Sequence, residues 1–308
     1  MSLIAAWRAH RLLTPTQRRV LSERRLRGSY TAEQWLGLLE RIAELDRQAD
    51  AARKRCGLLA IIGIVAVFLG LMFLVPLLSG VGAPDWLVGI LALLLVGLPI
   101  VCGVLYFTLR GRDLPNNLRE LIYPLLCVLR EDVAPNTPLE LEADLRGGMV
   151  KDKCTDEQNL SRGRLRYPKI LEIHYLDPWL SGAAALADGS TLRWKVADRI
   201  RVRRITKRTA RGKIKTKYKH KSKRLLEVSL GLRHKSYQIK TEAATDPQIQ
   251  VRPGERRDAL RLTKLMTLSG SMMGHRRDLD WTLPLDPLLE LVSAAYGRTV
   301  RNPSTQGA

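Results

Sequence analysis

Two uninterrupted apolar runs dominate the hydrophobicity pattern of the first third of the chain. They cover residues 57–78 and 86–109, and neither contains a charged side chain. As helices at 1.5 Å per residue they are about 33 and 36 Å long, more than the roughly 30 Å hydrocarbon layer of a bilayer. Because both are apolar on every face, they predict a transmembrane hairpin rather than two core helices. A long polar segment precedes the first run, which argues against a cleavable signal peptide.

Basic residues predict how this hairpin is oriented. They stand next to the outer limits of the two runs: Arg53, Lys54, Arg55, Arg110 and Arg112. The linker 79–85 contains no Lys or Arg. Positive residues are retained in the cytoplasm, so both termini are predicted to be cytoplasmic and the linker external. Trp86 and Tyr106, near opposite ends of the second run, are typical of the aromatic belts at the two membrane interfaces.

The segments that flank the hairpin have helical patterns. Residues 1–56 predict cytoplasmic amphipathic helices near 15–27 and 32–55, each preceded by a Thr with a Gln three residues later, as in a capping box. Residues 110–134 predict a juxtamembrane helical segment that Pro124 interrupts.

From residue 135 the apolar period changes to two, which is typical of strands. The strand candidates are 139–144, 169–176, 179–187, 190–206, 213–232 and 235–240. Residues 147–168 have a loop-like composition, 258–268 are ambiguous between strand and helix, 286–297 predict a closing helix, and 298–308 predict a flexible tail. Many short strands without alternating helices favour an antiparallel sheet over 135–297, folded as a small sandwich or open barrel. The expected fold class is an α+β membrane protein.

Charge changes this picture at one place. The chain carries 51 Lys plus Arg against 30 Asp plus Glu, a net charge of +21, and residues 199–226 hold fourteen of these cations without an acid. Lys occupies every second position from Lys213 to Lys223, so six ammonium groups project from one face of a strand. If this strand pairs with the preceding one through a turn near 209–212, cations face cations across the ladder, which destabilises the pair unless an anion, salt or water relieves it. The opposite face is only weakly apolar, so this hairpin is expected to project beyond the core as an arm.

Several functions are compatible with the basic hairpin. Its predicted anion-binding residues are Arg199, Arg201, Arg203, Lys213, Lys215, Lys217, Lys219, Lys221 and Lys223. Anionic lipid headgroups or an acidic partner protein are the first expectation, since each basic residue near an anionic leaflet contributes about 1 kcal/mol. Nucleic acid is the alternative, although only Tyr218 interleaves the run as an aromatic. A solvated face that keeps the domain soluble and blunts an edge strand is the simplest explanation.

No catalytic motif accompanies these features. The five His and four Cys lack metal-ligand spacing, and the chain contains no phosphate-binding loop, dinucleotide fingerprint or nucleophile elbow. We therefore expect a non-enzymatic binding or assembly module, without cofactor or metal, in the inner membrane of a bacterium. A membrane-tethered nucleic-acid-binding protein is the second hypothesis and an oligomeric pore the third, and a homo-oligomer is left open.

Overall fold

The computed structural model describes residues 11–82, 84–111, 114–160, 169–209, 212–240, 249–268 and 282–302. The chain divides into two compact units. The first comprises Met1–Ser22 and Leu39–Leu114, and the second comprises Glu23–Leu38 and Pro115–Ala308. The described part of the first unit is helical, whereas the second contains the described strands.

Five helical elements account for the described part of the first unit. They are α2 (Pro15–Glu23), α3 (Ala32–Leu69, in this unit from Leu39), η1 (Gly70–Leu74), α4 (Val75–Gly80) and α5 (Asp85–Gly111). The capping box before α2 is formed, because Thr14 N–H donates to Gln17 Oε1 at 3.0 Å and Gln17 N–H to Thr14 Oγ1 at 3.3 Å. The same arrangement joins Thr31 and Gln34 before α3.

Glycines bring α3 and α5 close together. A Cβ atom on Gly63 would lie 2.8 Å from the Cβ atom of Pro99, and one on Gly70 would lie 2.8 Å from Leu95 Cδ1. Two helical stretches, Ala32–Leu74 and Trp86–Leu109, are long and apolar enough to cross a membrane. Their apolar side chains are exposed, as the 74% exposure of Leu93 illustrates.

The second unit contains a large antiparallel sheet with the strand order β1-β2-β4-β5-β6-β9-β8, and β3 pairs with β4. The strands are β1 (Arg25–Tyr30), β2 (Leu139–Asp144), β3 (Cys154–Asn159), β4 (Lys169–Ala185), β5 (Thr191–Arg208), β6 (Ile214–Arg233), β8 (Ile249–Arg252) and β9 (Arg257–Leu268). A separate two-stranded sheet joins β7 (Tyr237–Ile239) to β10 (Thr299–Arg301). Four short helical elements complete the unit: η2 (Leu118–Ile122), α6 (Tyr123–Asp132), η3 (Lys151–Lys153) and α7 (Asp286–Gly297).

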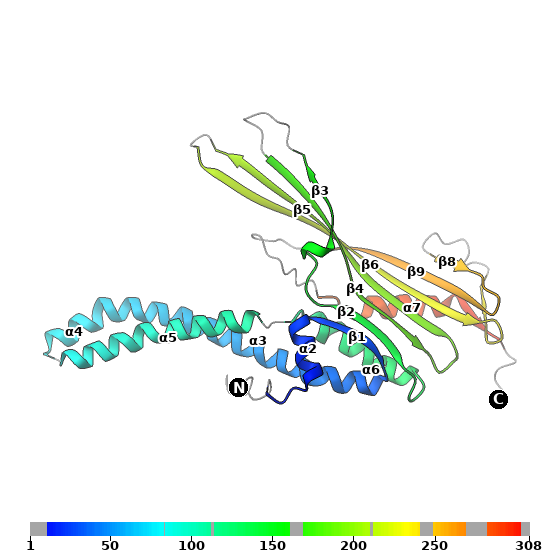
Figure 1. Cartoon of the computed structure of the whole chain (residues 1–308), viewed down its shortest axis with the longest axis horizontal. Helices are drawn as coiled ribbons and strands as arrows, with labels where there is room; N and C mark the ends of the chain where they lie inside the picture. Colours follow the sequence, from blue (N-terminus) through cyan, green and yellow to red (C-terminus); the bar gives the residue numbers. More distant parts are fainter. Residues whose placement is uncertain are drawn as a thin grey trace. The chain divides into compact units, whose positions relative to one another are not determined.

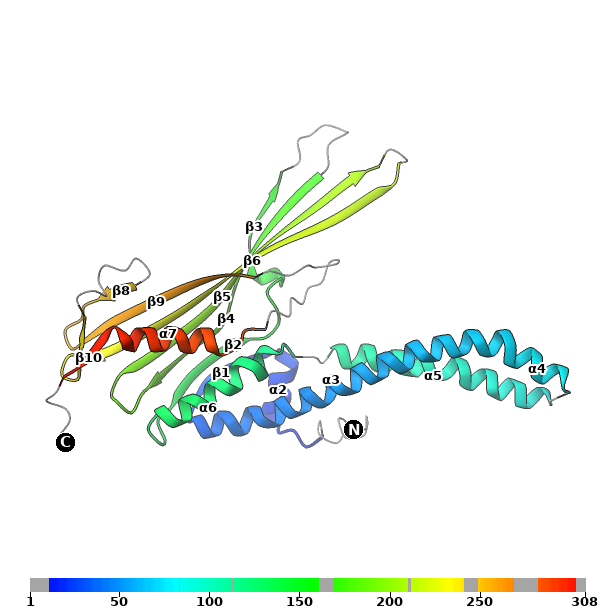
Figure 2. The same cartoon turned by 180° about the vertical axis from the view of Figure 1, so that it is seen from behind.

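Helices cover one face of this sheet. Figures 1 and 2 show α6 and α7 on the same side of the strands. The side chains on that side form the core, from Leu26 of β1 across Leu141 and Trp194 to Leu230 and Leu260, each at most 3% exposed. The indole of Trp35, in the first turn of α3, donates to the carbonyl oxygen of Leu139 at 2.9 Å and ties that turn to β2.

The predicted α+β fold with N-terminal helices and a large antiparallel sheet is confirmed, but the expected sandwich or barrel is wrong. Eight of the described strands form one open sheet, because β1 and β8 lie at its two ends and do not pair with each other. Helices, rather than a second sheet, bury its apolar face. The sheet also contains two strands that the sequence pattern does not predict. The strand β1 begins where the predicted helix 15–27 would continue, and β3 lies in the predicted loop 147–168.

Two predicted strands are one. Residues 169–176 and 179–187 belong to the continuous strand β4, which contains a register shift, a β-bulge, between Asp177 and Leu180. The bulge accommodates Pro178, which has no N–H for the ladder. The predicted tail begins with β10, and its residues 303–308 lie outside the described residues.

Four strands continue past the helix-covered part of the sheet and form a projecting arm (Figures 1 and 2). We define the arm as residues 154–159, 169–176, 199–208 and 214–223. The expected projection beyond the core is therefore present, but the basic hairpin of β5 and β6 is not alone in it. The strands β4 and β3 extend the hairpin on one side.

Candidate anion-binding site on the arm

The register of β5 and β6 places cations directly opposite cations. Arg199 lies opposite Lys223, Arg201 opposite Lys221, Arg203 opposite Lys219 and Lys207 opposite Lys215. The like-charge ladder expected from the sequence is thus found. We call this side of the arm the basic face. Lys217 lies on it between Lys215 and Lys219, and Lys213 stands one residue before β6.

A turn that suits the register joins the two strands. The amide of Thr209 donates to the Lys213 carbonyl at 2.8 Å, and Gly212 N–H donates to the Thr209 carbonyl at 2.9 Å. Gly212 has φ of +77°, a conformation that glycine adopts without steric cost. Residues 210 and 211 of the predicted turn lie outside the described residues.

A shallow hollow of about 560 Å³ lies on the basic face. Four cations from two strands line it: Arg199, Arg201, Lys221 and Lys223. His174 of β4 and Thr155 of β3 close its other side. Tyr175, Leu176 and Ile200 complete its lining, so the hollow combines apolar side chains with long, flexible donors that suit an anionic group.

Glu172 of β4 is the acid that neutralises part of this face. Its carboxylate binds the Arg203 guanidinium and accepts from His174 Nε2 at 3.0 Å, and Arg201 Nη1 lies 3.8 Å away. The hydrogen bond from Arg203 lowers the pKa of Glu172 and outweighs the opposite effect of burial. Among the described residues, no acid forms an ion pair with Arg199, Lys219, Lys221 or Lys223. The β6 edge of the basic face therefore keeps its charge.

The other face of the arm is less polar. Ile200 and Val202 are each 3% exposed there. Tyr218 is half-buried and lies opposite Arg204, on this same side. Its neighbours Lys217 and Lys219 point the other way, so Tyr218 does not lie among the lysines, and the rings that line the hollow are those of His174 and Tyr175 of β4.

Buried ions stand where the arm joins the core. Asp177 and Asp198 are directly opposite each other in the ladder of β4 and β5, and both are buried. Lys153 Nζ lies 2.7 Å from Asp177 Oδ1, and Arg224 donates to both carboxylate oxygens of Asp198 at 2.6 and 2.7 Å. Burial raises the pKa of Asp177 to about 6 despite the nearby lysine. These pairs were not predicted, because each partner comes from a different strand or helix.

A neighbouring carboxylate has the opposite shift. Burial by itself raises the pKa of Asp144, but hydrogen bonds from Arg146 and the ammonium of Lys153, 3.2 Å away, lower it to about 2. Within the described ranges, no group of three or more His, Cys, Asp or Glu is arranged to hold a metal ion. The cluster is thus a set of ion pairs that neutralises charge at the base of the arm.

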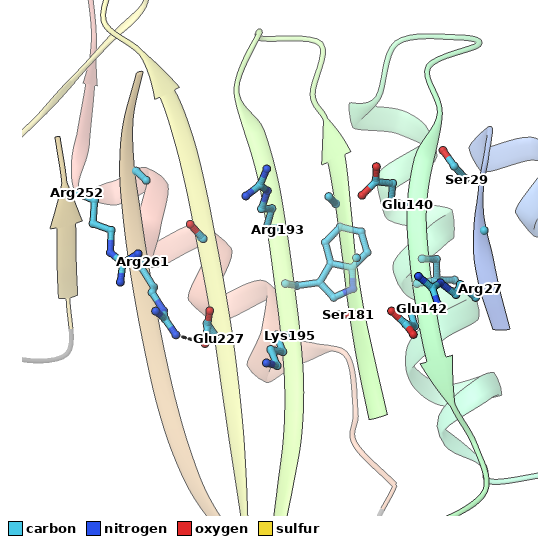
Figure 3. A pocket seen from close by; sticks show the side chains of 17 residues that line it. Arg27, Ser29, Glu140, Glu142, Ser181, Arg193, Lys195, Glu227, Arg252 and Arg261 are labelled. Carbon is cyan, nitrogen blue, oxygen red and sulfur yellow. Dashed lines mark hydrogen bonds and ion pairs between the residues drawn. The ribbon is translucent and has the colours of Figure 1, made fainter. Parts of the chain in front are cut away.

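A second and larger hollow, of about 770 Å³, lies on the uncovered face of the core sheet (Figure 3). Its side chains alternate in charge across the strands, with α6 and α7 behind the sheet. We call this the open face. Arg261 donates to Glu227 at 2.5 Å, the ion pair marked in Figure 3.

The predicted interface residues of the apolar helices occupy varied positions. Trp86 is 66% exposed, and Arg53 binds Asp50 at 3.0 Å. The ring of Tyr106 packs against Gly57, 3.3 Å from the position that a Cβ atom would take there. Lys54 and Arg55 are exposed; Arg110 is near the end of α5, and Arg112 lies outside the described residues.

No protein-family model, curated protein or solved structure matches this chain.

Proposed function

We propose that this chain is a membrane-anchored binding module whose basic face binds anionic lipid headgroups on the cytoplasmic side of a bacterial inner membrane. The observation that carries the proposal is the ladder of Arg199, Arg201 and Arg203 against Lys223, Lys221 and Lys219. Like charges directly opposite one another destabilise a strand pair. A bound anion relieves this repulsion, so the free energy lost in the ladder is recovered on binding.

The anchor is the pair of helices α3 and α5. A core helix of a soluble protein buries its apolar side chains, but Phe68 and Leu93 are 68% and 74% exposed. A bilayer is the environment in which such side chains are stable. The excess of Arg and Lys outside the two apolar runs supports a cytoplasmic location for both termini.

Lipid is favoured over nucleic acid because of the two faces of the arm. Proteins that bind single-stranded nucleic acid combine cations with aromatic rings on which bases stack. The Tyr218 ring is on the opposite side from the lysines. Headgroup phosphates need only charge and hydrogen-bond donors, which Arg199, Lys221 and Lys223 supply around the hollow.

The test uses the full chain in nanodiscs of neutral phosphatidylcholine. These are mixed with sucrose-loaded vesicles, with or without phosphatidylglycerol, and the vesicles are pelleted. We expect capture only by anionic vesicles, weakening as salt rises. The variant with Lys219, Lys221 and Lys223 changed to Gln should bind about 100-fold more weakly, since three basic residues contribute about 3 kcal/mol.

A matched control changes the net charge equally at other exposed cations. In it Lys235, Arg252 and Arg256 become Gln, and it should be captured like the parent chain. Equal loss in both variants would mean that net charge, not the arm, determines binding. Capture of labelled single-stranded nucleic acid, lost with the three lysines while anionic vesicles are ignored, would establish the alternative function.

The anchor has its own test in intact cells. A single cysteine at Ser79, in a chain whose native cysteines are Ser, should react with a membrane-impermeant maleimide from outside. A cysteine at Ser22 should react only after the cells are opened. The reverse pattern would contradict the proposed orientation, and extraction of the chain by alkaline carbonate would contradict the anchor.

A further inference from the structure

The open face carries an ordered charge pattern centred on β4. One row across the strands reads Arg27, Glu142, Ser181, Lys195, Glu227, from β1 through β2, β4 and β5 to β6. The next row reads Ser29, Glu140, Ala183, Arg193, Ser229. Each row has a small neutral residue on β4. Strands at equal distances on the two sides of β4 carry matching residues. Glu142 corresponds to Lys195 and Arg27 to Glu227 in the first row. Glu140 corresponds to Arg193 and Ser29 to Ser229 in the second.

Most of these charges have no partner among the described residues. Arg27, Glu140, Glu142, Arg193 and Lys195 are exposed, and within the described residues none forms an ion pair or side-chain hydrogen bond. Figure 3 accordingly marks no interaction between Arg27 and Glu142, which have opposite charges and stand on adjacent strands. Glu227 is bound instead to Arg261, outside the symmetric rows.

We propose that the open face is the interface of a symmetric homodimer, with its two-fold axis parallel to β4. Two sheets that pack face to face lie about 10 Å apart. Rotation about such an axis exchanges the two sides of β4 and preserves position along the strands. It therefore places Glu142 over the partner's Lys195, Glu140 over the partner's Arg193 and Arg27 over the partner's Glu227.

The charge pattern also selects this axis among the symmetric alternatives. An axis in the plane but perpendicular to the strands would place β2 over its own copy, with Glu140 and Glu142 near the partner's carboxylates. The small side chains of Ser181 and Ala183 lie on the proposed axis, where the two sheets approach most closely. Adjacent strands are rotated by about 20–25°, so two facing sheets diverge away from the axis and their charges need to be complementary only near it. The complementary charges extend over the two strands on each side of β4.

The test measures the oligomeric state of the full chain in detergent by sedimentation equilibrium. The parent chain should dimerise, and Glu142→Lys and Lys195→Glu should each raise the dimer dissociation constant at least tenfold, because like charges then meet twice. Glu142 and Lys195 are separated by β4, so a contact within one chain would not explain why one charge change compensates for the other. Mixing the two variants in equal amounts should restore a dimer, since a heterodimer has matched charges at both positions.

Two controls make the outcome decisive. Glu131→Lys changes the same charge on α6, away from the open face, and should leave the dissociation constant unchanged. In a chain without Cys127 and Cys154, Ser181→Cys should crosslink to its copy through a short bismaleimide. Thr263→Cys should not, because it lies three strands from the axis, where the other side has no strand.

A monomeric parent chain, or a mixture of the two charge variants that dimerises no better than either alone, would overturn the proposal. A dimer that is unaffected by every charge change would assign association to the apolar helices instead. Circular dichroism of each variant distinguishes lost association from lost folding.

Discussion

The Arg224 guanidinium binds both carboxylate oxygens of Asp198, at 2.6 and 2.7 Å, with the two side chains 2% and 7% exposed. The guanidinium also lies 5.4 Å from the ring centre of Trp179. This pair closes the core where the apolar face ends and the arm begins. A buried ion pair of this kind is costly to break, although it contributes little when both partners are present.

We predict that Arg224→Met destabilises the chain by about 3–5 kcal/mol, because Asp198 is then buried without a counter-charge. Replacing both residues, as Asp198→Leu with Arg224→Met, should cost much less than the single change. Denaturant unfolding of the full chain in detergent measures both. A single variant as stable as the parent would show that water reaches Asp198.

The pH dependence of stability should reveal Asp177. Its pKa is raised from about 3.9 in the unfolded chain to about 6 in the folded one. The folded state therefore binds more protons between these values, and its stability falls as pH rises from about 4 to about 6. The loss is about 3 kcal/mol, and Asp177→Asn should remove it. The difference between parent and variant unfolding curves from pH 4 to 8 measures this; a constant difference would contradict the assignment.

Asp144 should act in the opposite sense and in a lower range. Because its folded pKa is about 2, the stability it contributes is complete above about 4 and is lost as pH falls toward 2. When these curves are extended down to about pH 2, Asp144→Asn should therefore flatten their acid limb while leaving the region above pH 4 parallel to the parent. Loss of the acid limb in Asp177→Asn instead would reverse the two roles.

The turn between β4 and β5 depends on Asp188. Its carboxylate accepts hydrogen bonds from the hydroxyls of Ser190 at 2.6 Å, Tyr237 at 2.7 Å and Tyr296 at 3.0 Å. Tyr296→Phe should cost about 1 kcal/mol and Asp188→Ala more, because several donors then lose their acceptor. Thermal unfolding in detergent measures both, and equal effects of the two changes would contradict the central position of Asp188.

Gly182 is required by the packing of Trp194. A Cβ atom at this position would lie 2.2 Å from Trp194 Cζ2 and 2.7 Å from the Glu140 carbonyl oxygen. Gly182→Ala should destabilise the sheet by about 1–3 kcal/mol, the usual cost of overpacking. The control is Gly37→Ala on α3, where a Cβ meets nothing within 4 Å and should stabilise the helix by about 0.5–1 kcal/mol. Equal effects of both changes would argue against the close contact.

The sequence predicted the elements whose side chains follow a strict period. The alternating lysines of β6 and the Pro287-to-Gly297 pattern of α7 each determine local structure with neighbouring residues alone. The register of β5 and β6 followed from one turn. Membrane insertion, headgroup binding and domain boundaries remain predictions.

The missed strands lack such a period. In β3 the residues Cys154–Asn159 are all polar or small and mostly exposed, so pairing with β4, not burial, makes them a strand. β1 buries one large side chain, Leu26, and pairs with a strand more than a hundred positions later. The symmetric rows of the open face likewise depend on register across several strands, which periodicity within one segment does not define.

The continuity of β5 has a mechanical consequence. This strand is 18 residues long, about 59 Å at 3.3 Å per residue, and runs without a register shift against β6 from the core to the tip of the arm. A pull on the tip along the strands loads many ladder hydrogen bonds in parallel, as shear, instead of opening them one after another. The arm therefore resists being pulled apart and transmits tension along its strands to the helix-covered core.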